Sequence, residues 1–407
     1  MAINNCLYSP TSDNPSGFSV WFVPACRQAG LKSSVLNHPI THSRDRCEQL
    51  YIMKKFLIIP ILLSVLSCAE TTKNKETVSS LMDKSHFRHL RYLVNVKNET
   101  AQKYWPDFGT SDFHQPIVYY TKDNAFVLNP TEHILNKFEY QEVGNFNKVL
   151  VIQLPDSLNE TTSLQFHTGV TSDSTQLNYK QPILYFQSYE LTKKFLQDDL
   201  KDLEDWSIMV IHELFHGYQW SKPEMFELAR TTSMPGGPDE FLGSYHKDLD
   251  WYKESVEKEN DLLKAIWIDG ANLIQNLKQF DSLRDLRIER IKKEYDVDIR
   301  AAEDYEITIE GNARYSESLM KRYLAENRPD ASFLTDEDKR SIINMFDGYD
   351  VSKDKALFDI YNSRYYYQIG YNISMILEKY ELDFISRINT DEVNLLELLE
   401  ELKSSQQ

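Results

Sequence analysis

Two histidines and a glutamate lie close together in an apolar segment of the chain. Residues 211–216 read IHELFH and so contain the pattern His-Glu-x-x-His. Residues four positions apart share one face of a helix, so the rings of His212 and His216 can bind the same metal ion. Glu213 can then take a proton from a water molecule that the metal has made acidic. This combination predicts a zinc site with hydrolytic chemistry.

The residues around this pattern favour a buried site. Residues 206–220 are predicted to form a mostly apolar helix, in which bulky uncharged side chains flank the histidines. Burial of two histidines and a glutamate without partners costs free energy, and a metal ion compensates that cost. Two other interpretations remain: a surface helix with two incidental histidines, and a pair of hydrogen-bonded histidines in the core.

The third ligand is expected downstream, in residues 307–317, which read ITIEGNARYSE. A catalytic zinc ion takes three protein ligands and keeps a fourth position open. The segment resembles the helix that supplies the third ligand in gluzincin metallopeptidases, including the aminopeptidase N-like group, where the pattern is apolar-x-x-Glu-Gly-x-Ala-x-Tyr. By that resemblance Glu310 is the third zinc ligand, and Gly311 allows close packing against the helix at 206–220. The matching positions are Glu310, Gly311, Ala313 and Tyr315, and Glu317 falls in a similar place.

The resemblance leaves other ligands open. The 93 residues between the second histidine and Glu310 (310 − 216 − 1) form a longer link than in familiar gluzincins, so residues 231–305 are expected to be an insertion. Glu306, one helical turn earlier, and Glu254 are the alternatives to Glu310. His246 is expected at the surface, because the His-x-x-Gly-x-x-His continuation of a three-histidine site is missing.

A tyrosine further along resembles another element of the same family. Residues 367–370 form a Tyr-x-x-Gly pattern, and in aminopeptidase-like gluzincins the hydroxyl of this tyrosine faces the tetrahedral oxyanion. By that match Tyr367 donates a hydrogen bond to the oxygen where negative charge develops, with Tyr371 as the alternative. The Gly-x-Met-Glu-Asn motif that binds the substrate amine in aminopeptidases is absent from the sequence. The resemblance therefore implies a zincin metallopeptidase and not an aminopeptidase in particular.

The elements that position these residues fall into two halves. Short β-branched and aromatic runs predict strands within a β-rich segment, at 116–121, 125–128, 148–154 and 182–189. Helical spacing predicts a short helix near 87–94, a hairpin over 246–305 after a Pro/Gly loop at 231–240, and helices at 206–220, 306–326 and 365–380. The fold class is therefore α+β, with a small β-rich N-terminal half followed by a mostly helical, zincin-like half with a helical insertion. The expected catalytic domain spans 106–407, after a tether and lead-in at 68–105.

The N-terminal part resembles a bacterial lipoprotein precursor. Two lysines precede an apolar run over 56–67, which is too short to span a bilayer but has the length of a signal-peptide core. The run ends in Val-Leu-Ser-Cys, which resembles a lipobox, so Cys68 is expected to carry a lipid that anchors the domain to a membrane of the cell envelope. Residues 53–67 are then the signal peptide, and residues 1–52 are interpreted as a mis-assigned upstream start.

Charge and cysteine content narrow the function classes. The chain carries a formal net charge of −17, which disfavours binding to the phosphates of nucleic acids. No cysteine follows Cys68, which excludes an intrachain disulfide and a cysteine nucleophile in the mature domain. The sequence thus predicts a lipid-anchored, zinc-dependent metallohydrolase that cleaves a peptide or protein substrate. The alternative is a non-catalytic cell-surface binding lipoprotein on a zincin-like scaffold.

Overall fold

Short apolar runs of the N-terminal part form a six-stranded mixed sheet. The computed structural model describes residues 82–110, 115–197, 200–232, 237–343, 346–348, 350, 352–360, 363–388 and 393–406. The strands are β1 (Ile117–Tyr120), β2 (Ala125–Leu128), β3 (Gln141–Phe146), β4 (Val149–Gln153), β5 (Phe166–Gly169) and β6 (Ile183–Gln187). Their order in the sheet is β3-β4-β2-β1-β6-β5, in which β1 and β6 are parallel and the other neighbours are antiparallel.

Both faces of the sheet centre are covered, which explains why its strands read as continuous apolar runs. All residues of β2 and β6 are buried. One face joins the main core of the molecule through Tyr119, Phe126 and Phe186. The other face packs with helix α3 (Glu132–Lys137) in a second core that includes Val118, Val127 and Ile134. A strand that is buried on both faces has no polar face to alternate with its apolar one.

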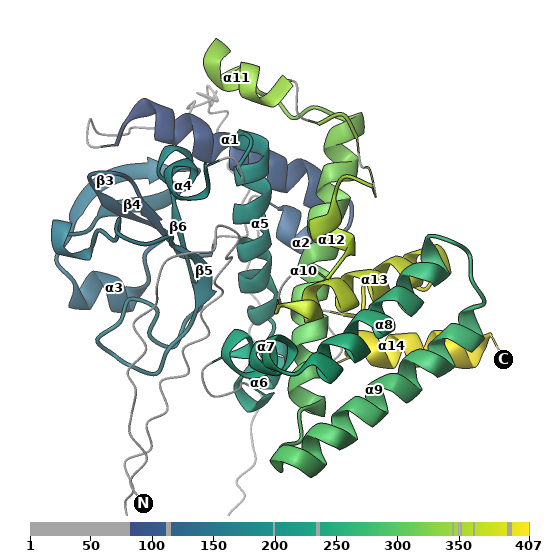
Figure 1. Cartoon of the computed structure of the whole chain (residues 1–407). Helices are drawn as coiled ribbons and strands as arrows, with labels where there is room; N and C mark the ends of the chain where they lie inside the picture. The colour runs from purple at the N-terminus through teal and green to yellow at the C-terminus, as the bar shows by residue number, and fades with distance from the viewer. Residues whose placement is uncertain are drawn as a thin grey trace, which may run out of the picture. The chain divides into compact units, whose positions relative to one another are not determined.

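Helix α5 (Leu203–Trp220) lies between the sheet and the C-terminal helices (Figure 1). Asp202 caps its first turn, because the carboxylate accepts a hydrogen bond from the backbone N–H of Asp205. The helix contacts β5, β6, α1 (Lys84–Ala101) and α10 (Arg300–Glu326). A helix that is apolar around most of its surface is stable when other elements surround it. The polar side chains that α5 carries are therefore buried with it.

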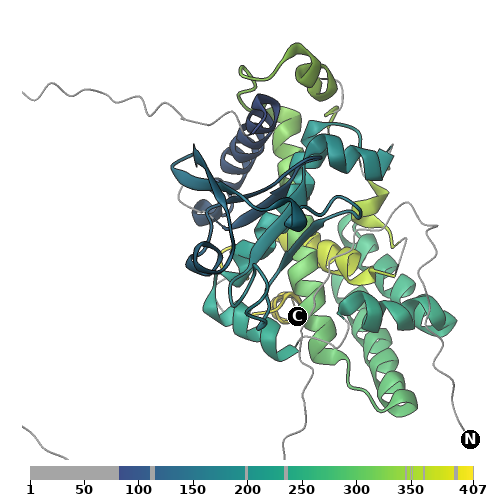
Figure 2. The ribbon, with the colours of Figure 1, turned by 90° about the vertical axis from the view of Figure 1, so that its left-hand side faces the viewer.

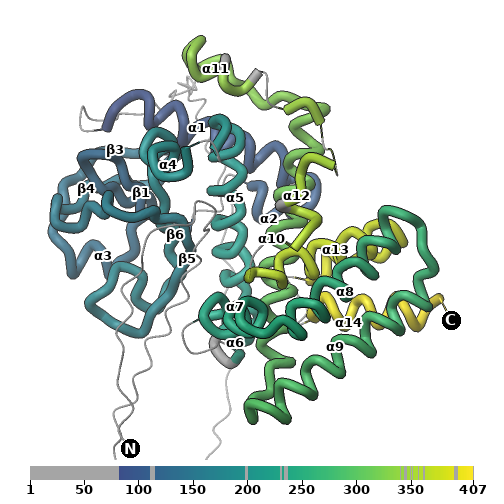
Figure 3. The backbone as a smooth tube through the Cα atoms, viewed as in Figure 1, coloured from purple at the N-terminus to yellow at the C-terminus, as the bar shows by residue number. Residues whose placement is uncertain are grey.

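The C-terminal part is helical. Helices α8 (Asp250–Trp267) and α9 (Leu273–Tyr295) form the expected hairpin (Figure 3), and α10 packs against α13 (Tyr365–Lys379). In the turned view of Figure 2 the strands lie in front of the green and yellow helices. The remaining α-helices are α2 (Pro106–Gly109), α4 (Tyr189–Leu196), α6 (Pro223–Thr232), α7 (Pro238–Asp248), α11 (Asp336–Ile343), α12 (Lys355–Phe358) and α14 (Leu395–Ser405). The α+β class predicted from the sequence is confirmed.

Several elements differ from the sequence-based predictions. Strands β3 and β5 were not predicted, because their sequences QEVGNF and FHTG are partly polar and contain glycine, and they form where a neighbouring strand offers hydrogen bonds. The end of the predicted β-rich segment is helix α4, and the predicted short helix near 87–94 extends over all of α1. The predicted loop ends before Pro238, which begins α7 at a position where its missing N–H leaves no hydrogen bond unmade.

The N-terminal predictions concern residues that the structure does not describe. The signal peptide at 53–67, the lipid site at Cys68 and the upstream segment 1–52 all lie outside the described residues. The described residues belong to one compact unit, in which α1 packs against α5 although it falls in the predicted lead-in. Within that described part, no helix is long and apolar enough to cross a bilayer.

Candidate metal centre

Three side chains from two helices converge on one point in the core. The Nε2 atoms of His212 and His216, on α5, lie 3.1 Å apart, and each lies 3.3 Å from Oε2 of Glu310 on α10. Zinc bonds of 2.0–2.1 Å in a tetrahedral site place neighbouring ligand atoms about 3.3 Å apart. The three donor atoms therefore have the spacing that one zinc ion requires, and they form a group able to hold a metal.

One oxygen of the Glu310 carboxylate lacks a hydrogen bond in this cluster. Its Oε2 atom is buried and lies 3.3 Å from Nε2 of each histidine, but neither contact has the geometry of a hydrogen bond. A buried carboxylate oxygen is costly without a well-placed positive partner, and a cation at the centre of the three donors would supply one. The donor set of two imidazoles and one carboxylate is one that zinc uses in hydrolytic enzymes. The residues present thus fit the predicted Zn²⁺.

Further side chains fix the orientation of both imidazoles. Nδ1 of His212 lies 2.6 Å from Oε1 of Glu317, whose carboxylate is also paired with Arg314 at 3.0 Å. Nδ1 of His216 lies 2.9 Å from Oε1 of Gln219. The carboxylate oxygen beside Nδ1 of His212 and the amide oxygen beside Nδ1 of His216 favour a proton at each Nδ1, so that Nε2 of each ring is the atom available to a metal. Gln219 also donates to the carbonyl oxygen of Ile309 at 3.2 Å, which ties the ligand helix α5 to α10.

These contacts set the charges of the metal-free cluster. Burial alone would lower the pKa of His212, but the Glu317 and Glu310 carboxylates raise it to about 10. Burial alone would raise the pKa of Glu317, but Arg314 and His212 lower it to about 2. His212 is therefore protonated at neutral pH in the absence of a metal. A metal ion has to displace that proton when it binds.

Glu213 faces the sheet. Its Oε2 accepts a hydrogen bond of 3.1 Å from the backbone N–H of Thr168, on the edge strand β5. The hydroxyl of Thr168 donates to the carbonyl oxygen of Glu213 at 2.6 Å. Burial raises the pKa of the Glu213 carboxyl, and the nearby His216 and His212 partly offset that effect. A carboxyl with a raised pKa is suited to taking up and returning a proton near neutral pH.

Tyr367 is the tyrosine of α13 that lies beside the cluster. Its ring stacks on His212 with centroids 6.0 Å apart, and the guanidinium of Arg314 lies 5.1 Å from its centroid. The described residues offer its hydroxyl no hydrogen-bond partner. Burial raises the pKa of Tyr367 well above its ordinary value, so the hydroxyl keeps its proton. The alternative Tyr371 instead donates to Ser318 at 3.1 Å within the packing of α13 on α10.

The remaining sequence candidates lie outside the three-donor group. Glu254 is exposed and lies 3.9 Å from Lys258, and Glu306 is buried one turn before Glu310. The prediction for His246 is wrong: it is 3% exposed and stacks on Tyr365 at 5.4 Å. Residues 238–248 form helix α7 and do not continue the loop. This helix places the ring of His246 against Tyr365 of α13, so His246 is buried.

The prediction that Gly311 packs closely against the helix at 206–220 is also wrong. A Cβ atom on Gly311 would lie 2.3 Å from Cα of Gly370, so this glycine allows α10 to approach α13 and not α5. Gly370, the glycine of the Tyr-x-x-Gly pattern, is the residue of α13 that faces Gly311.

The sequence patterns did not point to Gln219 and Thr168 as residues of the site. Gln219 could have been found by its spacing, since it lies three residues after His216 on the same helix face.

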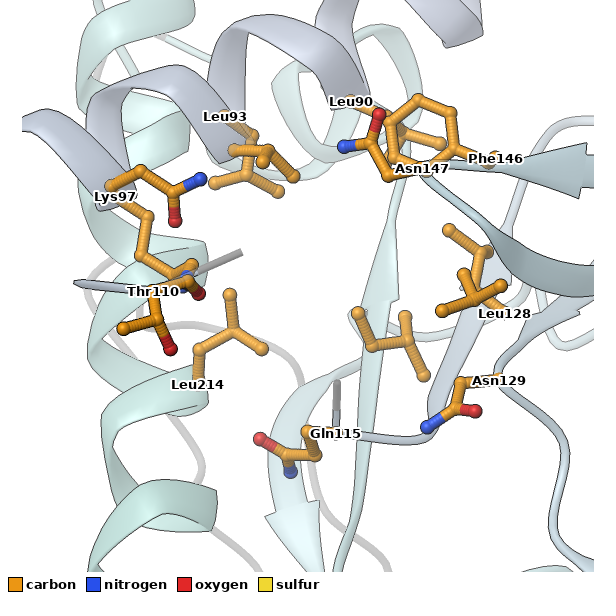
Figure 4. Close-up of a pocket in the computed structure, with 14 residues that line it drawn as sticks. Leu90, Leu93, Lys97, Thr110, Gln115, Leu128, Asn129, Phe146, Asn147 and Leu214 are labelled. Carbon is orange, nitrogen blue, oxygen red and sulfur yellow. The ribbon is translucent and has the colours of Figure 1, made fainter. Parts of the chain in front are cut away.

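A separate cavity lies on the opposite side of α5 (Figure 4). It measures about 80 Å³ and is lined mainly by apolar side chains of α1, α5 and the sheet, including Leu90, Leu93, Leu128, Phe146 and Leu214. Leu214 is two residues from each histidine, which puts it on the other face of the helix. The cavity is therefore distinct from the metal-ligand cluster.

Comparisons with known proteins give no match for this chain. No protein-family model, no curated protein and no solved structure is similar to it. The function of this chain is therefore inferred from the three donor residues, their burial and the groups that surround them.

Proposed function

We propose that this chain is a zinc-dependent metallohydrolase of gluzincin type that cleaves peptide bonds. His212, His216 and Glu310 would hold Zn²⁺. The observation that carries the proposal is the buried group of three donor atoms, 3.1–3.3 Å apart, with the carboxylate of Glu213 next to it. A bound zinc ion would supply Lewis acidity, which polarises the scissile carbonyl and acidifies water.

Glu213 is the proposed general base. It would accept a proton from the attacking water and pass this proton to the leaving nitrogen. A purely structural metal site needs no such group beside it. The hydrogen bond from Thr168 holds one carboxylate oxygen in place at 3.1 Å, which leaves the other oxygen for proton transfer. This arrangement favours hydrolysis over structural metal binding.

Tyr367 is the proposed oxyanion donor. Its neutral hydroxyl has no partner among the described residues, and its ring is fixed by His212 and Arg314. A preorganised donor of this kind stabilises the negative charge that develops on the carbonyl oxygen. Neither ionisation nor a competing hydrogen bond weakens it.

A peptide is the proposed substrate because an edge strand borders the site. Strand β5 is the last strand of the sheet, and Thr168 of β5 contacts the proposed base. An extended peptide can add to such an edge through backbone hydrogen bonds. The formal net charge of −17 supports a protein or peptide partner over a nucleic acid.

The proposed location is the bacterial cell envelope. The charged start, the short apolar run and the lipobox-like end at Cys68 support a lipid anchor. Radiolabelled palmitate should enter the expressed precursor and not its Cys68→Ala variant. Label in both proteins would contradict lipid attachment at this cysteine.

The decisive experiment combines metal analysis with a peptide library. Purified protein dialysed without chelator should retain about one zinc ion per chain and cleave members of a quenched fluorescent library. Glu213→Gln should keep the zinc and lose cleavage. A chain that neither retains nor takes up zinc would contradict the hydrolase. If the wild-type protein holds zinc and binds peptides without cleaving them, and the Glu213→Gln variant binds them equally well, the binding lipoprotein is favoured.

A further inference from the structure

Glu306 is a buried carboxylate without a partner. It is 3% exposed, and the described residues give it neither a hydrogen bond nor an ion pair. Glu306 lies one turn before Glu310 on α10, and residues four apart share a helix face. An ionised carboxylate that is removed from water without compensation is costly. Its presence on the face of the metal ligand therefore needs a physical reason.

The other buried acids near the cluster are compensated. Asp239 of α7 accepts from Arg364 at 2.9 Å and from the hydroxyl of Tyr366 at 2.7 Å. Glu317 is paired with Arg314 at 3.0 Å. Two positive charges of a zinc ion would be balanced by Glu310 and Glu213. Among the described residues around the cluster, Glu306 is thus the acid left without a counter-charge.

The surroundings of Glu306 disfavour its ionised form. Burial raises the pKa of the Glu306 carboxyl well above its ordinary value, and the negative charges of Glu310 and Asp239 raise it further. The guanidinium of Arg364 forms its ion pair with Asp239 instead, at 2.8 Å. The carboxyl therefore keeps its proton while the site is empty, and a cation that arrives from outside the protein would favour its ionised form.

We propose that Glu306 determines specificity by binding a positively charged group of the substrate, an ammonium or a guanidinium, beside the metal centre. The inference rests on the proposed hydrolase function and deepens it. Two parts of a peptide can supply this charge: a lysine or arginine side chain, or a free N-terminus. A carboxylate that makes a buried charge pair with one ligand rejects a neutral ligand of the same shape, because it is then left unpaired.

The first test uses matched quenched fluorescent peptides. One pair differs by lysine against norleucine, a second by arginine against citrulline, and a third by a free against an acetylated N-terminus. The wild-type protein should cleave the cationic member of at least one pair with kcat/KM about 100-fold higher. The pair that shows the difference identifies the source of the charge. Equal kcat/KM within all three pairs would overturn the proposal.

Substitution of Glu306 provides the matched variant. Glu306→Gln keeps the shape of the side chain and should reduce kcat/KM for the preferred cationic peptide about 100-fold, with little change for its neutral partner. Glu326→Gln, the same change at an exposed position of the same helix, should leave both values unaltered. Zinc content and thermal melting of each variant show whether the fold is intact. An equal loss for both peptides in a folded, zinc-loaded Glu306→Gln protein would contradict a role in charge recognition.

A binding measurement separates this inference from the hydrolase proposal. In the Glu213→Gln background, which should not cleave, the preferred cationic peptide should bind at least tenfold more tightly than its neutral partner. Adding Glu306→Gln should abolish that difference. If the wild-type protein never cleaves but binding still depends on Glu306, the hydrolase proposal fails and the charge site stands. If the wild-type protein cleaves but neither cleavage nor binding depends on Glu306, the charge-site proposal fails and the hydrolase proposal stands.

Discussion

Gly311 and Gly370 meet where α10 crosses α13. A Cβ atom on Gly370 would lie 2.0 Å from the carbonyl oxygen of Ile307 and 2.7 Å from Cα of Gly311. Only two residues without side chains allow the backbones to approach this closely. Since α10 carries Glu310 and α13 carries Tyr367, the crossing sets the separation between the proposed ligand and the proposed oxyanion donor.

Gly370→Ala should therefore destabilise the protein and weaken its site. The added methyl group meets backbone atoms, which cannot rotate away, so the helices must separate at a cost of about 1–3 kcal/mol. Urea unfolding measures the change in the free energy of unfolding. Gly243→Ala is the control, because the nearest atom to its Cβ is 3.3 Å away on the side chain of Ser363. Equal effects of the two variants would contradict the account of the crossing.

Gln219 should influence zinc affinity without binding zinc. Its side chain holds Nδ1 of His216 and links it to the carbonyl of Ile309. Loss of such an outer contact lowers metal affinity about 10–100-fold. Competition with a zinc-binding dye should show this loss for Gln219→Ala and no change for Gln275→Ala, an exposed glutamine of α9. Unchanged affinity in the Gln219→Ala variant would mean that His216 is oriented by packing alone.

Zinc binding should release protons. The pKa of His212 is raised to about 10 in the metal-free cluster, so the imidazole is protonated at neutral pH and has to lose a proton before Nε2 can bind. Zinc affinity should fall as the pH is lowered from 8 to 6, because protons compete more strongly. Calorimetric titrations in buffers of different ionisation enthalpy measure the number released. The same enthalpy in every buffer would contradict this prediction.

Glu303 should make the protein sensitive to acid. Burial alone would raise its pKa, but Arg287 and Arg284 lower it from 4.5 to about 2. A carboxylate with a lowered folded-state pKa stabilises the fold above the unfolded value of 4.5, and this contribution, about 3 kcal/mol, is lost as the pH falls towards 2.

The variant Glu303→Gln tests this contribution. Because it leaves buried Arg287 with one carboxylate partner fewer, it should be less stable than the wild type at pH 7, and the gap should narrow as the pH falls to 2. Urea unfolding at several pH values follows both proteins. A gap that stays constant over this range would show that Glu303 does not titrate between 4.5 and 2.

Local sequence patterns predicted the parts of the site that share one segment. The spacing of His212 and His216 needs only a helix to bring both rings to one side, and α5 supplies it. The grouping of Glu310 with them was predicted through a resemblance, since 93 residues (310 − 216 − 1) separate it from His216. The main helices and four strands also follow from apolar patterns.

Contacts between distant segments could not be predicted in this way. Thr168 reaches Glu213 from β5, a strand of four residues that exists only through its pairing with β6. The burial of His246 depends on α7 packing against α13, which no local pattern of residues 238–248 reveals. Gly311 was assigned the wrong partner helix, because close approach is a property of two segments and a sequence motif shows only one.

The double attachment of Thr168 to Glu213 makes the proposed base depend on correct strand alignment. Both the backbone N–H and the hydroxyl of this residue bind the same glutamate. If β5 slipped by one residue along β6, His167 or Gly169 would stand there, and every side chain of the strand would change face. Such a protein would keep its metal ligands but lack a positioned base, and Phe166 of β5 would leave the main core. Misalignment at this edge would thus lower stability and turnover together, although the ligands on α5 and α10 would stay in place.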